Sequence, residues 1–435
     1  MKVVIMAGGK GTRISSVASD IPKPMIRICG KPILEHQIEN LRACGLNDIT
    51  LVIGHLSEVI KDYFKNGQDF GVRISYFEET QPLGTAGALF KIPTLTDDFL
   101  LMCGDLIINV DFNRFMDFHR KCKAWASLLV HPNDHPFDSS ILTTETLPPN
   151  EKGGLPIETH KVTGWISKED ERHDYRNRVN AGIEIISPRL LKETKKHFTP
   201  RHPDQPDKID LDRDVLRPNI HSGHIYAYET PEYVKDMGIP SRLQEVEKDM
   251  MEGKVLARNL KRPQRAIFLD RDGTINTYKG FLTHVEDFEL LPGAAEAIKL
   301  INRAGFLAIV VSNQPVIARG ECSFETLQSI HNKMDTLLGR EGAFLNAIYY
   351  CPHHPDSGFA GELPDYKFDC NCRKPKPGLL LKAAHDLNID LSLSYMIGDS
   401  ERDVQAGINA GVGQSFLIEK NKPEALLHVV KQICH

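Results

Sequence analysis

The feature that most constrains this chain is a pair of aspartates, Asp270 and Asp272, that lies well beyond the middle of its 435 residues. The apolar run 266–269 before them predicts a buried strand, and Gly273 and Thr274 after them favour a sharp backbone turn. Open α/β sheets bind ligands beyond the carboxyl ends of their strands. We therefore expect a site for Mg²⁺ and phosphate at this strand end.

The same strand opens a new series of strands and helices, so a complete domain must precede it. A chain of this length exceeds what one hydrophobic core normally supports. The stretch 253–264 is basic and contains Pro263, which favours a linker. We predict an α/β protein with two Rossmann-like, three-layer domains over residues 1–252 and 265–435.

The composition excludes several classes of function. The chain is 41% hydrophobic and 26% charged with a net charge of −5, so no basic excess indicates a nucleic-acid partner. No apolar run is long enough for a membrane span or a signal peptide. Nine cysteines without a secretion signal favour a reducing compartment. We expect a cytoplasmic protein that binds small molecules and no membrane, and a homo-oligomer is compatible with the sequence.

A glycine-rich segment follows a predicted strand at 3–6. Glycines allow backbone N–H groups to approach phosphate oxygens, and the guanidinium of Arg13 adds a permanent charge. Lys23 lies between two prolines, which stiffen the loop and hold its ammonium in place. The spacing matches neither a dinucleotide-binding fingerprint nor a P-loop. The predicted phosphate-binding residues are Gly8, Gly9, Gly11, Thr12, Arg13 and Lys23.

The segments 7–13 and 22–25 together resemble the signature of the sugar-phosphate nucleotidyltransferases. The segment 81–88 is similar to the family's base-contacting turn. The segment 235–240 resembles the family's second metal motif, in which Ile239 replaces a threonine. The resemblance implies Mg²⁺ ligands at Asp105 and Asp236 and substrate contacts at Gly84, Thr85, Gly104, Lys168, Asn180 and Gly182.

These residue types suit nucleotidyl transfer. A sugar 1-phosphate is already a nucleophile at neutral pH, so the reaction needs in-line placement and charge neutralisation rather than a general base. Mg²⁺ held by Asp105 and Asp236 would bridge the phosphates. Arg13 and Lys23 would offset the negative charge of the nucleoside triphosphate.

Later strand ends supply the groups that complete the aspartate pair. The segment 312–314 follows a predicted strand, Lys374 precedes a predicted helix, and Asp399 follows another predicted strand. With Asp270 and Asp272, this ordered set resembles the motifs of the haloacid dehalogenase phosphatase superfamily. The resemblance implies phosphate contacts from Ser312, Asn313, Gln314 and Lys374, with Arg319 and Arg373 gripping a second anionic group.

The resemblance also implies a role for each residue. Asp270 would attack phosphorus and form an aspartyl-phosphate. Asp272 would donate a proton to the leaving sugar oxygen and later take one from water. Mg²⁺ would be held by Asp270, Asp399 and the backbone carbonyl of Asp272, while Ser312 and Lys374 would bind the transferring oxygens.

Two short pairs, Cys351-Pro-His353 and Cys370-Asn-Cys372, form a third constellation. Three thiolates and one imidazole suit tetrahedral Zn²⁺ with no open position, which indicates a structural ion. Such an ion would order the polar segment 356–369 and hold it against the basic residues that follow Cys372.

The zinc pairs, together with the segments 270–276 and 312–314, resemble the zinc-loop phosphatases that act on D-glycero-D-manno-heptose 1,7-bisphosphate. Histidinol phosphatases are close relatives of that family. Pro315-Val316 replaces the family's usual Ser-Gly, so we expect a differently shaped loop around Arg319. The run 11–24 is most similar to heptose 1-phosphate guanylyltransferases, which implies GTP and GDP-heptose.

The fusion connects the two resemblances, because the phosphatase product, a heptose 1-phosphate, is what the transferase consumes. The sequence therefore predicts a bifunctional enzyme that makes GDP-D-glycero-α-D-manno-heptose, with Mg²⁺ at both sites and structural Zn²⁺. Two alternatives stay open. One joins a histidinol-phosphate-type phosphatase to a hexose 1-phosphate nucleotidyltransferase, and the other has an N-terminal half that only binds and regulates.

Overall fold

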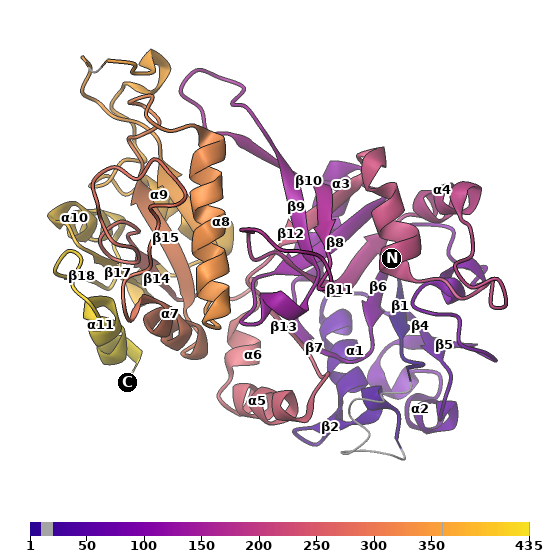
Figure 1. The fold of residues 1–435 in the computed structure, drawn as a ribbon. Helices are drawn as coiled ribbons and strands as arrows, with labels where there is room; N and C mark the ends of the chain where they lie inside the picture. The colour runs from indigo at the N-terminus through magenta and orange to yellow at the C-terminus, as the bar shows by residue number, and fades with distance from the viewer. Residues whose placement is uncertain (10–20, 359, 435) are drawn as a thin grey trace. The chain divides into compact units, whose positions relative to one another are not determined.

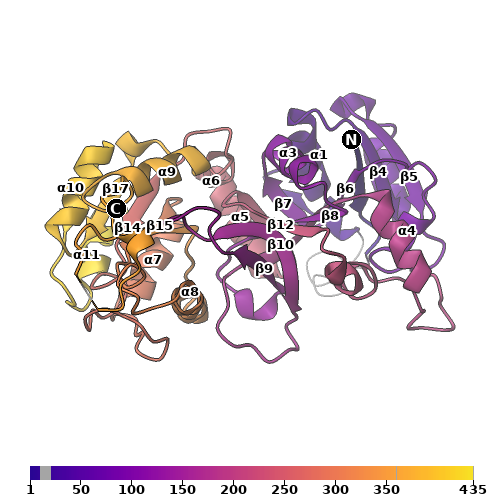
Figure 2. The same cartoon turned by 90° about the horizontal axis from the view of Figure 1, so that it is seen from above.

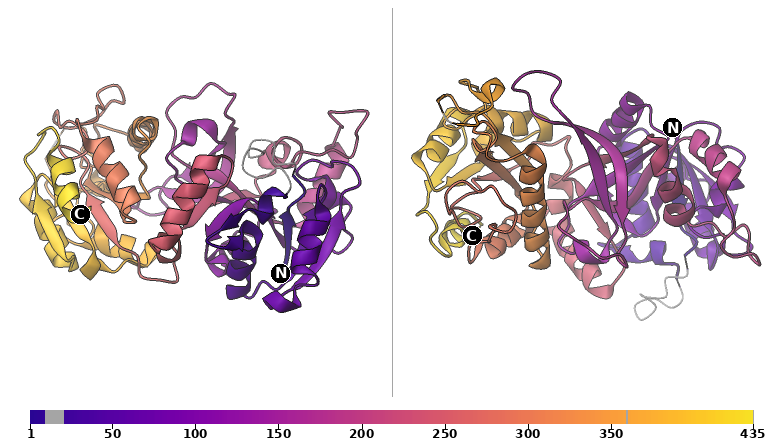
Figure 3. Two further views of the ribbon diagram at one scale, coloured as in Figure 1. Left: turned by 90° about the horizontal axis from the view of Figure 1, so that it is seen from below. Right: turned by 45° about the horizontal axis from the view of Figure 1, so that its top comes forward.

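The computed structural model describes residues 1–9, 21–358 and 360–434. The chain forms two compact units, which Figures 1, 2 and 3 show from several sides. The domain boundaries at 1–252 and 265–435 remain a prediction, and the stretch predicted as a linker contains the short helix α6 (Lys254–Ala257). The first unit comprises Met1–Val130, His160–Trp165 and Asn180–Asn259, and the second comprises His131–Thr159, Ile166–Val179 and Leu260–His435.

The larger sheet is mixed, because β11 pairs antiparallel with β6. Its order is β5-β4-β1-β6-β11-β8-β12-β10-β9, and β1 pairs in parallel with both β4 and β6. Val3, Val4 and Ile5 are fully buried, as expected for a parallel strand that is covered on both faces. The strands are β1 (Lys2–Met6), β4 (Asp48–Ile53), β5 (Arg73–Glu78), β6 (Phe99–Cys103), β8 (Ala126–His131), β9 (Ile141–Leu147), β10 (Ile157–Ile166), β11 (Val179–Ile186) and β12 (Ile225–Glu229).

The helices of the first unit follow local sequence signals. The helix α4 (Pro188–His197) begins after Ser187, whose hydroxyl accepts a hydrogen bond from the N–H of Arg189. Pro188 occupies the first turn, where its missing N–H costs nothing. The other helices are α1 (Ile33–Ala43), α2 (Ser57–Phe64), α3 (Phe112–Cys122) and α5 (Pro240–Met251).

The second unit contains a parallel sheet in the order β16-β15-β14-β17-β18. Ile267 and Leu269 pack with α7, α8 and α11, whereas Ala266 and Phe268 pack with α9 and α10. Helices therefore cover both faces of the sheet (Figure 2), and the predicted α/β fold class is confirmed. The elements are β14 (Ala266–Leu269), β15 (Leu307–Asn313), β16 (Ala347–Cys351), β17 (Tyr395–Gly398), β18 (Gln414–Leu417), α7 (Ala294–Arg303), α8 (Phe324–Arg340), α9 (Gly378–Leu387), α10 (Glu401–Ala410) and α11 (Ala425–Cys434).

Within the described ranges, no helix has the length and apolar character needed to cross a lipid bilayer.

Candidate active sites

Three carboxylates meet at the carboxyl end of the second unit's sheet. Asp270 follows the central strand β14, Asp399 follows β17, and Asp403 lies in the first turn of α10. One carboxylate oxygen from each of the three lies within 4.8 Å of the others. Asp270 and Asp399 therefore lie close together as predicted, and Asp403 is a third member of the cluster.

Lys374 neutralises part of this negative charge. Its ammonium lies 2.9 Å from Asp270 Oδ1 and 2.5 Å from Asp403 Oδ1, and it donates to the carbonyl of Val311 at 2.8 Å. Burial raises the pKa of Asp270 to about 6, although Lys374 acts in the opposite direction. Burial lowers the pKa of Lys374, but the two aspartates outweigh it and raise the pKa above its usual value. The lysine therefore stays charged beside the predicted nucleophile.

The residues at this strand end fit a divalent cation. Asp399 Oδ2 is buried and has no hydrogen-bond partner among the residues that the structure describes, although the ammonium of Lys420 lies 3.3 Å away. A Cβ at Gly273, which has a φ of +84°, would lie 2.3 Å from the same oxygen. Carboxylate oxygens are the ligands that Mg²⁺ prefers, and clustered carboxylates repel one another unless a cation is bound. The donor set of Asp270, Asp399 and Asp403 therefore suits Mg²⁺.

The side chain of Asp272 is not part of this cluster. Its carboxylate is held by Arg271, with Nη2 2.8 Å from Oδ2 and Nε 3.1 Å from Oδ1. Gln314 Nε2 donates to Oδ2 at 2.8 Å, and Asn276 Nδ2 donates to Oδ1 at 3.1 Å. The backbone carbonyl of Asp272, predicted as a further metal ligand, stays a prediction.

Arg271 and His331 belong to this network, and no role was predicted for either residue from the sequence. The side chain of Arg271 is fully buried, and its Nη1 lies 3.3 Å from His331 Nε2 on α8. Burial lowers the pKa of His331 well below its usual value, and the charge of Arg271 acts in the same direction. A neutral His331 can therefore accept a hydrogen bond from Arg271. In the sequence, the position of Arg271 between Asp270 and Asp272 could have indicated a role at this site.

The other predicted phosphate-binding residues are tied to one another. Gln314 Nε2 also donates to Ser312 Oγ at 2.7 Å. Asn313 exchanges two hydrogen bonds of 3.0 Å with the backbone of Lys374, so its side chain fixes the loop that carries this lysine. The guanidinium of Arg319 pairs with Glu321 at 2.7 Å. Substrate contacts by these residues stay predictions.

The Pro315-Val316 replacement has a structural counterpart. Val316 is 1% exposed and packs with Ile317, Cys322 and Leu327 in a small apolar cluster. A valine can fill apolar space that the usual Ser-Gly pair would leave empty. The packing of Val316 in this cluster therefore holds the loop that leads to Arg319.

The four predicted zinc ligands also come together. The Sγ atom of Cys370 lies 3.4 Å from that of Cys351 and 3.2 Å from that of Cys372. His353 Nδ1 lies 3.3 Å from Cys372 Sγ, and all four donor atoms lie within 4.8 Å of one another. Such separations suit donors arranged about one ion at bond lengths of about 2.0–2.3 Å. The set therefore fits tetrahedral Zn²⁺.

Two paired strands of the first unit position the predicted metal aspartates of the transferase, with Asp105 in the turn before one strand and Asp236 at the end of the other. β7 (Leu106–Asn109) and β13 (Tyr233–Asp236) pair antiparallel with Leu106 opposite Asp236. The N–H of Met237 donates to the carbonyl of Asp105 at 2.9 Å, so the two aspartates are brought together. Lys23 forms an ion pair with Asp105.

Asp236 has a cationic partner that the sequence did not indicate. Arg242, at the start of α5, forms an ion pair with Asp236, and the N–H of Gly238 donates to Asp236 Oδ1 at 2.9 Å. Both predicted metal aspartates are therefore paired with a basic side chain, and a metal ion would compete with that side chain for the carboxylate.

Several predicted substrate residues of the transferase lie in tight backbone contacts. Gly84 has a φ of +78°, and a Cβ there would lie 2.4 Å from the carbonyl oxygen of Ile209. Thr85 Oγ1 accepts a hydrogen bond from the N–H of Leu211 at 2.7 Å. A Cβ at Gly104 would lie 2.9 Å from the carbonyl of Met6. These close approaches explain why glycine occupies both positions.

The remaining transferase predictions have mixed outcomes. Gly11, Thr12 and Arg13 lie outside the described residues, whereas Gly8 and Gly9 follow β1 as predicted. Lys168 is exposed and is counted with the second compact unit, so its predicted sugar-phosphate contact stays a prediction. Asn180 Oδ1 accepts from the N–H of Gly182 at 3.3 Å, and a Cβ at Gly182 would lie 3.2 Å from Cys103 Sγ.

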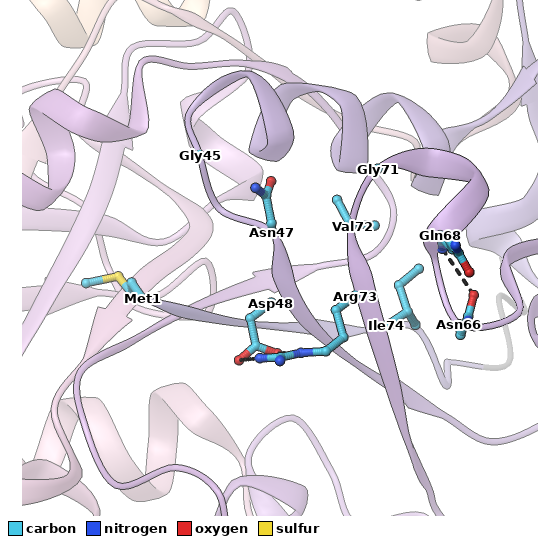
Figure 4. A pocket seen from close by; sticks show the side chains of 10 residues that line it. All are labelled: Met1, Gly45, Asn47, Asp48, Asn66, Gln68, Gly71, Val72, Arg73 and Ile74. Carbon is cyan, nitrogen blue, oxygen red and sulfur yellow. Dashed lines mark hydrogen bonds and ion pairs between the residues drawn. The ribbon is translucent and has the colours of Figure 1, made fainter.

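A shallow hollow lies at the other edge of the large sheet. It has a volume of about 680 Å³, and Asp48 pairs with Arg73 there at 2.9 Å (Figure 4). Asp48 and Arg73 begin their strands, whereas Gly8 and Asp105 follow the carboxyl ends of theirs. Parallel strands place these ends at opposite edges, so the hollow is separate from the predicted transferase site.

Comparisons with known proteins match both halves of the chain. A family model described as nucleotidyl transferase matches residues 2–138, and one described as haloacid dehalogenase-like hydrolase matches residues 219–411. The chain is 42% identical over 158 residues to the D-glycero-beta-D-manno-heptose-1,7-bisphosphate 7-phosphatase of Yersinia pestis, which covers 36% of this chain and 82% of the relative. The chain belongs to the D-glycero-beta-D-manno-heptose-1,7-bisphosphate 7-phosphatase family.

Other members and structures are similar over parts of the chain. The 7-phosphatase of Vibrio cholerae is 43% identical over 170 residues, which are 38% of this chain and 89% of the relative. The structure of HddC from Yersinia pseudotuberculosis complexed with GMP-PN is 25% identical with a TM-score of 0.45, covering 57% of this chain and 99% of that chain. The family models matched over residues 2–138 and 219–411 show that this member of the 7-phosphatase family joins a nucleotidyltransferase domain to its phosphatase domain, and the predicted bifunctional organisation is confirmed.

Proposed function

We propose that this enzyme removes the 7-phosphate of D-glycero-D-manno-heptose 1,7-bisphosphate and then transfers GMP from GTP to the resulting heptose 1-phosphate. The products are phosphate, pyrophosphate and GDP-heptose. The observation that carries the phosphatase step is the buried Lys374 between Asp270 and Asp403, in a chain of the 7-phosphatase family. The nucleotidyl transferase match over residues 2–138 supports the second step.

In the phosphatase step, a carboxylate oxygen of Asp270 attacks phosphorus and the bond to the sugar oxygen breaks, which leaves an aspartyl-phosphate. Asp272 gives its proton to the departing sugar oxygen and afterwards takes a proton from the water that cleaves the acyl phosphate. Lys374 offsets charge on the transferring oxygens. Asp270, Asp399 and Asp403 would hold Mg²⁺, which would supply further neutralisation of the carboxylate and phosphate charges.

In the transfer step, a phosphate oxygen of heptose 1-phosphate attacks the α-phosphorus of GTP and pyrophosphate leaves. The chain contributes positioning and charge, because the nucleophile needs no general base at neutral pH. Lys23 lies at Asp105 and is suited to the triphosphate, and Asp105 with Asp236 would hold Mg²⁺. The division into domains over 1–252 and 265–435, structural Zn²⁺ and a cytoplasmic location complete the proposal.

The decisive experiment incubates the purified chain with heptose 1,7-bisphosphate, GTP and Mg²⁺. We expect equal amounts of phosphate and GDP-heptose, and parallel reactions with the α and β anomers identify the anomer accepted. Phosphate release without any nucleotide sugar would contradict the paired function. Histidinol phosphate and other sugar 1-phosphates serve as competing substrates.

Two variants assign each half-reaction to its site. Asp270→Asn should abolish phosphate release yet still convert supplied heptose 1-phosphate and GTP into GDP-heptose. Asp105→Asn should do the reverse, because it removes a carboxylate of the transferase only. Unchanged guanylyl transfer by Asp105→Asn would indicate that the N-terminal half does not act as proposed.

A further inference from the structure

Part of the sequence of the N-terminal half belongs to the phosphatase unit. The segments 131–159 and 166–179, here called the arm, lie between β8 and β11 in the sequence but are counted with the second compact unit. The arm contains β9 and both ends of β10. Most of it lies outside both matched ranges, 2–138 and 219–411, so neither family model accounts for it.

One end of the arm is fixed on the helix α8. The N–H of Asn177 donates to Asp335 Oδ2 at 3.2 Å, and the guanidinium of Arg176 lies 3.3 Å from the same oxygen. The N–H of Tyr175 donates to Thr336 Oγ1 at 2.9 Å. Asp335 is 4% exposed, and a buried carboxylate without partners is costly. The arm therefore supplies partners to a buried carboxylate of the helix.

The tip of the arm reaches the predicted zinc centre. The carbonyl oxygen of Gly153 lies 2.7 Å from His353 Nε2. Gly153 has a φ of +70°, and a Cβ there would lie 2.4 Å from the carbonyl oxygen of Asp365 and 2.6 Å from the ring of Phe368. Any larger residue at this position would push the tip away from the histidine.

The geometry of His353 shows what this contact does. Its Nδ1 faces Cys372 Sγ at 3.3 Å and Cys351 Sγ at 3.5 Å, so Nδ1 is the atom that would bind the metal. In the metal-bound state Nε2 would therefore carry the ring hydrogen and donate it to the carbonyl oxygen of Gly153. Such an outer hydrogen bond fixes the tautomer and orientation of a histidine ligand, and its loss typically lowers metal affinity about 10- to 100-fold.

The contact also extends toward the phosphatase site. The carbonyl of His353 accepts a hydrogen bond from Arg373 Nη1 at 3.1 Å. Lys374, the next residue, bridges Asp270 and Asp403. The arm, the zinc ligand and the catalytic lysine are therefore connected by consecutive hydrogen bonds and one peptide bond.

We propose that the arm is an integral part of the phosphatase, in which Gly153 acts as a positioning residue for the zinc ligand His353. The first half of the sequence thereby supplies the second half with the outer partner of its metal centre. This inference rests on the proposed zinc centre but not on the identity of the sugar phosphate, so it can fail while the proposed function holds.

The test compares Gly153→Ala with Gly253→Ala in the full chain. Both glycines have a left-handed φ, +70° and +74°, but a Cβ at Gly253 meets nothing within 4 Å. Zinc release from the purified proteins to an excess of a chromogenic chelator is followed by absorbance. We expect Gly153→Ala to release zinc about 10-fold faster or more, with Gly253→Ala at the wild-type rate. Equal rates for all three proteins would overturn the proposal.

A spectroscopic measurement separates positioning from general damage. In the Co²⁺-substituted proteins, the visible bands of the S₃N centre should shift in Gly153→Ala and stay unchanged in Gly253→Ala. Nucleotidyl transfer by the same preparations reports whether the chain is folded. If Gly153→Ala has lost that activity as well, Arg176→Gln decides, because it loosens the other end of the arm without touching the tip. Faster zinc release by Arg176→Gln supports the proposal, and a wild-type rate contradicts it.

Discussion

The ammonium of Lys374 lies 2.9 Å from the carboxylate of Asp270, and both groups are removed from bulk water. This pairing has two consequences. It keeps the predicted nucleophile beside a positive charge that can offset the charge developing on the phosphoryl group. Removing the ammonium of Lys374 would also leave the buried carboxylates of Asp270 and Asp403 without a compensating positive charge.

We predict that Lys374→Met lowers phosphatase kcat about 10²- to 10³-fold and destabilises the second unit by about 3–5 kcal/mol. The matched control is Lys376→Met, whose ammonium pairs with Asp369 at the surface at 2.7 Å and should change stability by less than about 1 kcal/mol. Denaturant unfolding and phosphate release measure both effects. Similar behaviour of the two variants would show that the buried pair has no special role.

The second prediction concerns the hydrogen bonds that Arg271 donates to the carboxylate of Asp272. Arg271 binds both carboxylate oxygens of Asp272. Arg271→Lys keeps a positive charge at position 271 but should misplace Asp272, the predicted proton donor. We expect kcat for a sugar phosphate to fall about 10- to 100-fold, because the poor leaving group needs the proton. The rate with p-nitrophenyl phosphate, a good leaving group, should fall much less. Equal losses for both substrates would argue against this role, and the exposed Arg303→Lys serves as the control.

His331 gives the phosphatase unit a predictable response to acid. Burial lowers its pKa well below the unfolded value of about 6.5, so the unfolded chain binds more protons at acidic pH. The stability associated with a neutral, buried His331 is therefore fully present above about pH 6.5 and is lost progressively as the pH falls below that value. Its charged form would also face the guanidinium of Arg271.

The measurement is the free energy of unfolding between pH 7 and pH 5 for the wild type, His331→Gln and His385→Gln. The glutamine at 331 keeps an acceptor for Arg271 but does not titrate, so this variant should lose less stability on acidification than the wild type. His385 is 91% exposed and its replacement should leave the pH dependence unchanged. A pH dependence that is the same in all three proteins would contradict the assignment.

The sequence predicted the groups that lie at strand ends. Asp270 and Asp399 come together because parallel strands carry their carboxyl ends to one edge, which is a regularity of the fold rather than of these residues. Cys351, His353, Cys370 and Cys372 were predictable because their chemistry and spacing are specific.

The sequence did not predict the groups that reach the site from helices or from distant segments. His331 lies in the middle of α8, where a buried histidine and an ordinary helix residue give the same pattern. Asp403 was visible only as a helix residue beyond Asp399, and Arg242 only as a surface charge. The attachment of the arm to α8 was not predicted either, because it depends on pairings far apart in the sequence, such as Arg176 with Asp335.

The last prediction concerns the turn that contains Gly84. Gly84→Ala places a Cβ 2.4 Å from the carbonyl oxygen of Ile209, a contact that real structures do not tolerate, so the turn and the adjacent segment must separate. That separation would also break the hydrogen bond between Leu211 and Thr85. Because this turn is the predicted base-contacting element, we expect KM for the nucleotide to rise about 10-fold or more, equivalent to at least ~1.4 kcal/mol of binding.

Gly45→Ala is the matched control for this turn. Gly45 has a φ of +77°, close to that of Gly84, but a Cβ there meets nothing within 4 Å. Both variants carry the same left-handed strain of roughly 1–2 kcal/mol, so a difference between them reports the contact with Ile209 alone. Initial rates of nucleotide-sugar formation against nucleotide concentration give KM for each protein. If the two variants share a wild-type KM, the turn tolerates the displacement and the base is bound elsewhere.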